Sequence, residues 1–161
     1  MTDYIAAFFE ILENKDKKLV HALKYKLSLE GNFMCILGYK ISNDNDNLEN
    51  IIKKCNEFAV KDIGTSSDSY CTAGIFALLK GETDRGKAYL HTAIRNLSVK
   101  STAKILDIKD NGNNEALEYL VESRKTEYKN ILEKADNLKE IINYTLDEFC
   151  KKYDPKKAAL S

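Results

Sequence analysis

Apolar residues recur along most of the chain at steps of three and four, the spacing of one face of an α-helix. This pattern predicts eight helical segments, at about 3–13, 16–30, 33–42, 47–61, 68–80, 83–98, 100–108 and 115–153. Pro155 is the sole proline, so no proline interrupts a helix before that position. We therefore predict an all-α protein with a single helical domain over 1–153 and a flexible C-terminal tail over 154–161.

Short polar or glycine-containing stretches separate the predicted helices. They are Gly31-Asn32, the run from Asn43 to Asn47, Gly64 to Ser67, Gly81, and the run from Asp110 to Asn114. Between the first two stretches, residues 33–42 are apolar nearly all round. A helix of this kind is expected to be buried on several sides.

The longest uninterrupted pattern runs from Glu115 to Tyr153 and forms a heptad seam in which Arg124 occupies one position. The other seam residues are Leu117, Val121, Tyr128, Ile131, Ala135, Leu138, Ile142, Thr145 and Phe149. Such a seam suits either a long helix packed across its own domain or a coiled-coil dimer. Further apolar residues widen the face, so we predict packing within the chain and a monomer, with a homodimer as the alternative. Asp136-Asn137 is the one place where this helix could bend or split.

Residues 70–94 combine small and large side chains in a way that suits two closely packed antiparallel helices. The sequence reads Tyr70-x-x-Ala73-Gly74-x-x-Ala77-x-x-x-Gly81-x4-Gly86-x3-Leu90-x-x-Ala93-Ile94. The small residues allow the helices to approach, and Leu90 fills the space between them. The first half recurs earlier as Met34-x-x-Leu37-Gly38-x-x-Ile41, followed by Ile51, Cys55 and Phe58 on a second helix.

This pattern resembles the tetratricopeptide repeat over residues 33–98. The resemblance implies a right-handed stack of antiparallel helix pairs that ends in the long C-terminal helix; an irregular α-bundle is the alternative. It also implies a partner groove lined by the first helix of each pair. The exposed positions projected into that groove are Asn32, Cys35, Tyr39, Ser42, Asp68, Cys71, Ile75 and Leu78.

The function that follows from the resemblance is a non-enzymatic scaffold or adaptor that binds a protein or peptide. One alternative is a structural or regulatory homo-oligomer assembled through the long C-terminal helix. A helical enzyme whose active site is assembled from scattered residues is the third. The groove positions lack the basic residues of carboxylate-binding tetratricopeptide repeats, so a C-terminal carboxylate is not the expected ligand.

Composition narrows the partners further. Twenty-five basic and 25 acidic residues leave no net charge, which argues against a nucleic-acid partner because such proteins usually carry a basic surface. No apolar stretch approaches the roughly 20 residues needed to span a bilayer, and Asp3 and Glu10 do not suit a signal peptide. We predict a cytoplasmic protein with reduced, scattered cysteines at Cys35, Cys55, Cys71 and Cys150.

Two loop motifs approach known ligand sites, but each departs from its pattern at an essential residue. Asp107 to Glu118 matches the EF-hand spacing in part, but Lys109 occupies the third position, where an oxygen ligand is needed. We therefore predict a helix–helix turn there, with Gly112 at positive φ. Gly81 to Lys87 has phosphate-loop spacing, yet Ala88 replaces the required hydroxyl residue.

The two histidines, His21 and His91, lie on the charged sides of their predicted helices without metal-ligand partners at helical spacing. A pairing of His91 with Cys71 is conceivable because their helices are neighbours, but nothing else in the sequence supports it. We predict no catalytic residue, no metal and no cofactor.

Overall fold

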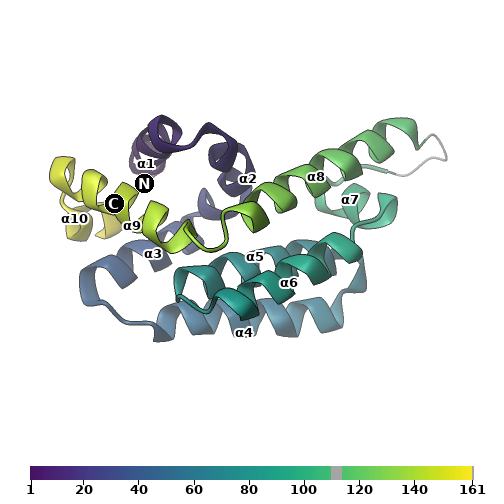
Figure 1. Cartoon of the computed structure of the whole chain (residues 1–161), viewed down its shortest axis with the longest axis horizontal. Helices are drawn as coiled ribbons and strands as arrows, with labels where there is room; N and C mark the ends of the chain where they lie inside the picture. Colours follow the sequence, from purple (N-terminus) through teal and green to yellow (C-terminus); the bar gives the residue numbers. More distant parts are fainter. Residues whose placement is uncertain (110–113, 161) are drawn as a thin grey trace.

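The computed structural model describes residues 1–109 and 114–160, and within them it contains helices and no strand (Figure 1). The helices are α1 (Thr2–Lys15), α2 (Lys17–Leu27), α3 (Glu30–Ser42), α4 (Asp46–Lys61), α5 (Ser66–Leu79), α6 (Thr83–Arg95), α7 (Val99–Ile105), α8 (Glu115–Glu133), α9 (Leu138–Lys152) and α10 (Pro155–Leu160). A short 3₁₀ turn, η1 (Ile63–Thr65), precedes α5. The all-α prediction is confirmed. None of the described helices is long and apolar enough to cross a membrane.

Local side-chain and backbone chemistry places the helix ends. Asp16 separates α1 from α2, because its carboxylate accepts a hydrogen bond from the backbone N–H of Leu19 (3.3 Å) at the start of α2. Asn43 ends α3 in the left-handed region at φ 54°, and Gly81 turns the chain after α5 at φ 87°. The boundary expected at Gly31-Asn32 lies slightly earlier, since α2 ends at Leu27 and Gly31 is already in the first turn of α3.

Helix α5 lies at the centre of the molecule, and every residue from Cys71 to Leu79 is buried. Its long antiparallel neighbours are α4 and α6, while α9 also contacts it. In Figure 1, α4, α5 and α6 form one half of the molecule, and α8 and α9 run between them and the pair α1–α2. A helix covered on all sides has no polar face, which explains why this segment is apolar nearly all round.

The closest helix crossing joins α5 to α6 through two glycines. A Cβ atom on Gly74 would lie 3.1 Å from the backbone oxygen of Gly86, and one on Gly86 would lie 3.0 Å from the oxygen of Gly74. The fully buried Leu90 fills the space beside Gly74, 2.9 Å from the position of that Cβ. The predicted tight pair is therefore confirmed.

The earlier copy of the pattern does not build a second crossing of this kind. A Cβ atom on Gly38 would meet only the side chain of Asn47, at 3.8 Å. Helix α4 packs mainly against α5 rather than against α3. The two copies of the pattern therefore differ in packing, because only the second has a glycine opposite its own glycine.

The segment predicted to be helical over 115–153 consists of two helices, α8 and α9. A tight turn at 134–137 separates α8 from α9, and it includes the Asp136-Asn137 pair where a break was foreseen. Backbone bonds within the turn replace the helical ladder, including one from the N–H of Asn137 to the oxygen of Lys134 (3.0 Å). Every seam residue is nevertheless buried by the same chain, each at most 7% exposed.

The C-terminal tail also departs from its prediction, because 155–160 form helix α10 rather than a flexible segment. Pro155 stands at the first helical position, where its missing N–H is not needed. Asp154 accepts a hydrogen bond from the N–H of Lys156 (3.0 Å). Ala158 is fully buried, and the helix packs against α3.

The glycine crossing predicts a large difference between two glycine-to-alanine substitutions. Gly86→Ala should destabilise the fold by about 1–3 kcal/mol, because the new methyl group would lie 2.5 Å from Cδ2 of the buried Leu78 and 3.0 Å from the backbone oxygen of Gly74. Gly31→Ala should be neutral or stabilise by about 0.4–1 kcal/mol, since nothing lies within 4 Å of its Cβ position. Urea unfolding of both variants measures the contrast; equal stability of the two would show that the close crossing does not exist.

Candidate functional site

The eight predicted groove positions do not form one surface. Cys71, Ile75 and Leu78 are buried, because the middle of α5 is enclosed by its neighbours. Their assignment to an exposed groove is wrong. In the arrangement that the tetratricopeptide resemblance implies, the first helix of each pair keeps one open face. Helix α5 has no open face in this region.

The other three predicted positions in α3 are Cys35, Tyr39 and Ser42, and they do not line a common opening. Cys35 and Tyr39 are half-buried and pack against the core. Ser42 is exposed at the end of α3, where its hydroxyl donates to the backbone oxygen of Gly38 (2.8 Å). These positions do not define a site.

Asn32 and Asp68, in contrast, line one open groove of about 430 Å³. The beginning of α3 forms one wall, a stripe of α4 forms the other, and the first half of α5 forms the floor. We call this the α3–α4–α5 groove. Its lining residues are Leu29, Asn32, Ile51, Lys54, Cys55, Phe58, Asp68, Ser69 and Thr72.

Large apolar side chains stand at the rim of this groove. Leu29 is 58% exposed and Phe58 is 51% exposed, on opposite walls. Ile51 and Cys55 continue the apolar wall along α4 at helical spacing. A concave surface that combines apolar walls with a few polar groups is the usual form of a binding site.

An ion pair lies beneath the floor of the groove. The ammonium of Lys26, from α2, contacts the Oδ1 atom of Asp68 on α5. Lys26 is only 4% exposed, whereas the side chain of Asp68 is 34% exposed and faces the groove. Burial lowers the pKa of Lys26, and the charge of the nearby Arg124 acts in the same direction. The carboxylate of Asp68 is thus held in place from the protein interior.

Helix α8 closes the other side of this cluster. The guanidinium of Arg124 is buried and lies 4.7 Å from the ring centroid of Tyr25, a cation–π contact. Glu127 is half-buried close by, and burial raises its pKa. The charged groups in this region therefore bind α2, α5 and α8 together.

The cysteines near the groove are not activated nucleophiles. Burial raises the pKa of Cys71 to about 11 and also raises the pKa of Cys55. A thiol reacts as its thiolate, so both side chains are in the unreactive form at neutral pH. The conceivable partner of Cys71, His91, has an exposed side chain, whereas Cys71 is fully buried.

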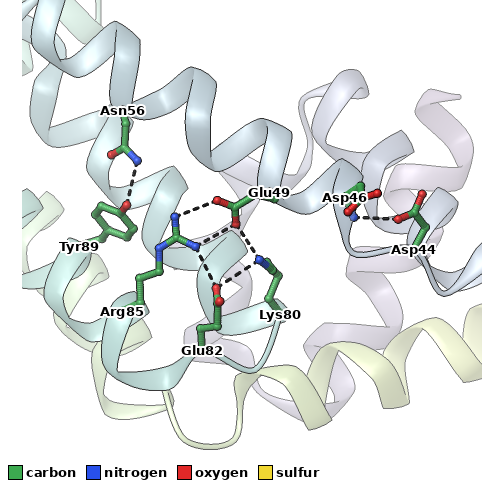
Figure 2. A network of polar contacts seen from close by, with 8 residues as sticks. All are labelled: Asp44, Asp46, Glu49, Asn56, Lys80, Glu82, Arg85 and Tyr89. Carbon is green, nitrogen blue, oxygen red and sulfur yellow. Dashed lines mark hydrogen bonds and ion pairs between the residues drawn. The ribbon is translucent and has the colours of Figure 1, made fainter.

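A second polar cluster joins α4 to α6 and includes Glu49, Lys80 and Arg85 (Figure 2). Arg85 donates from Nη2 to Oε1 of Glu49 (3.0 Å) and from Nη1 to Oε2 (2.9 Å), while Lys80 donates to the same Oε2 (2.7 Å). The hydrogen bond from Arg85, followed by that from Lys80, lowers the pKa of Glu49 to about 2. Glu82 completes the network. Because every group is matched within the cluster, we interpret it as a brace between helices.

The remaining motifs supply no site in the described part of the chain. Gly112, for which a positive φ was predicted, lies outside the described residues. Asp107, at the start of the same motif, has φ 54°. Lys87, at the end of the phosphate-loop-like stretch, forms an ion pair with Asp136 (3.0 Å). Across 1–109 and 114–160, no group of three or more His, Cys, Asp and Glu side chains is placed to hold a metal ion.

Sequence reasoning missed most of the α4 wall. Ile51, Cys55 and Phe58 were recognised only as apolar residues on the second helix of the earlier pattern. The signal that could have found them is the width of the apolar face, because Leu48, Ile52 and Ala59 already provide the buried residues of this helix. Ile51 and Cys55 pack against the edge of the core and also line the groove.

No protein-family model matches this sequence, and no curated protein or solved structure matches it either.

The buried ion pair predicts an asymmetric response to substitution. Asp68→Asn should destabilise the protein by up to about 3 kcal/mol, because it leaves the ammonium of Lys26 buried without a partner. The double variant Lys26→Met/Asp68→Asn should recover most of that loss, since it leaves no unpaired charge. As a control, Asp147→Asn breaks the exposed pair with Lys40 and should cost no more than about 1 kcal/mol. Urea unfolding measures the stability of the three variants. A double variant that is no more stable than Asp68→Asn would contradict the prediction.

The brace predicts a pH-dependent contribution from Glu49. Its pKa falls from 4.5 to about 2 on folding, so the stabilisation is complete above pH 4.5 and is lost as the pH falls towards 2. Glu49→Gln should lower stability by about 1 kcal/mol at neutral pH, and the difference from the unmodified protein should shrink below pH 4.5. Glu57→Gln, an exposed site on the same helix that forms no ion pair with any residue of 1–109 and 114–160, is the control. A pH-independent loss at Glu49 would rule out the ionic origin.

Proposed function

We propose that this protein is a non-enzymatic scaffold that binds a short segment of another protein in the α3–α4–α5 groove. The observation that supports this most is that two large exposed apolar side chains, Leu29 and Phe58, line the same groove. Large apolar side chains gathered at a concave surface are typical of interaction sites, whereas isolated ones are common everywhere on proteins.

The groove has the chemistry needed to hold an apolar anchor of a partner. Covering one large apolar side chain contributes roughly 1.5–3 kcal/mol, and Leu29, Ile51 and Phe58 provide the apolar contacts. The polar floor at Ser69 and Thr72 can orient the backbone of the bound segment by hydrogen bonds. These contacts suit a short peptide segment and require no chemical step.

The tetratricopeptide resemblance is part of the same proposal. The tight α5–α6 crossing and the antiparallel packing of α4 on α5 support a stack of helix pairs. The groove also includes residues from α3 and α5, which would be the first helices of two successive pairs. We propose that the repeat is present in this reduced form, with its binding surface confined to the beginning of the two helices.

We further propose that the protein acts as a monomer in the cytoplasm. The burial of the α8–α9 seam within its own chain supports a monomer over assembly through that seam. The cysteines Cys35, Cys55, Cys71 and Cys150 are free thiols, which supports a reducing compartment. The protonated state of the thiols near the groove gives no support to a cysteine-dependent enzyme.

Selection from a displayed library of random peptides tests the groove directly. Peptides selected on the unmodified protein should lose binding by about tenfold or more to Phe58→Asp, because a carboxylate at the rim removes an apolar contact worth at least 1.4 kcal/mol. Affinities are measured by fluorescence anisotropy with the selected peptides in synthetic form.

Val60→Asp is the matched control, since Val60 lies on the same helix, is 74% exposed and does not line the groove. Binding should be unchanged in this variant. Failure to select any peptide, or equal loss of binding in the two variants, would place the function elsewhere.

A further inference from the structure

Two charged side chains line the α3–α4–α5 groove and could select the partner. Asp68 lies on the floor, and Lys54 lies on the α4 wall. They would favour opposite charges on the bound segment. The surroundings of the two side chains differ, and this difference decides which of them has the larger effect on the choice of partner.

Asp68 is fixed and has an open acceptor. Its Oδ1 atom contacts the ammonium of Lys26, while no group of residues 1–109 and 114–160 is recorded as a donor to Oδ2. Its backbone oxygen accepts from the hydroxyl of Thr72 (3.2 Å), one turn further along α5. The side chain is one-third exposed and faces the groove. A carboxylate oxygen held in this way can accept a hydrogen bond without any reorganisation.

Lys26 orients this carboxylate without presenting its own charge to the groove. Its side chain is 5% exposed and does not line the groove. The buried ammonium therefore occupies only the Oδ1 atom of a carboxylate that lines the groove.

Lys54 has the opposite character. It is exposed and makes no recorded ion pair in the described chain. An exposed, flexible ammonium loses side-chain freedom and hydration when it pairs, so such pairs contribute little to affinity. A charge-assisted hydrogen bond to a fixed, partly buried carboxylate is stronger. Asp68 therefore contributes more than Lys54 to the affinity for a charged residue of the partner.

We propose that the groove recognises a basic side chain, arginine or lysine, adjacent to the apolar anchor of the bound segment, with Asp68 as the acceptor. This inference rests on the proposed function. Arginine fits best because its planar guanidinium presents several donors that match the geometry of a carboxylate. The partner is therefore a basic and apolar peptide segment.

The composition of peptides selected from the displayed library tests the proposal. Arginine or lysine should be enriched next to an apolar residue. Replacing that arginine by citrulline, which keeps the shape and removes the charge, should weaken binding to the unmodified protein by about tenfold, the factor that corresponds to one charge-assisted hydrogen bond of 1.4 kcal/mol.

The double variant Lys26→Met/Asp68→Asn removes the acceptor without leaving an unpaired buried charge, and circular dichroism checks that it is folded. Arginine and citrulline peptides should bind this variant equally. Glu57→Gln, an exposed acidic site on α4 outside the groove, should keep the tenfold preference.

Three outcomes separate the two proposals. Apolar peptides without basic enrichment, or enrichment of acidic residues, would overturn the role of Asp68 and leave the binding groove intact. A citrulline effect that persists in the folded double variant would also overturn it. If no groove-dependent peptide is selected at all, the proposed function itself fails.

Discussion

The enclosure of α5 is the constraint on which the other helices depend. A helix whose residues from Cys71 to Leu79 are all buried must be covered on every side, and two neighbours in an ordinary bundle would leave part of it open. The glycines at 74 and 86 bring α6 close enough for its backbone to contact that of α5. Helices α4 and α9 then cover the remaining sides, and the turn at 134–137 lets the C-terminal segment follow the core rather than project from it.

The groove opens at an interruption of this enclosure near the beginning of α5. Asp68 is one-third exposed there, although its neighbours Ser67 and Ser69 are buried. The same opening leaves Leu29 58% and Phe58 51% exposed, although Phe58 belongs to a helix whose other side is buried. The candidate site is thus a consequence of the packing, in that a helix buried along most of its length is open to solvent at Asp68.

The two polar clusters serve different purposes because they differ in burial. Glu49 and Arg85 meet in a bidentate pair near the surface, where each group is matched and water still reaches it. Such a pair braces α4 against α6 at little cost in desolvation. Lys26 is buried, so its ammonium depends on Asp68 alone for an ion-pair partner within the described residues. The buried pair therefore fixes the position of a carboxylate that still faces the groove.

Helix content, the glycine crossing and the burial of the heptad seam could be predicted from sequence alone, because each depends on residues at helical spacing or on side-chain size. The splitting of the C-terminal helix was foreseen only as an option at Asp136-Asn137, since local propensity there permits both outcomes. The helical tail was missed because the burial of Ala158 depends on α3, which is distant in sequence. Of the predicted groove positions, Asn32 and Asp68 line one opening, whereas Cys71, Ile75 and Leu78 are buried. Periodicity shows which residues share a face of a helix, but the neighbours that cover this face are chosen by the packing of the whole chain. Only the tertiary structure could decide that α5 is enclosed along most of its length and open at Asp68.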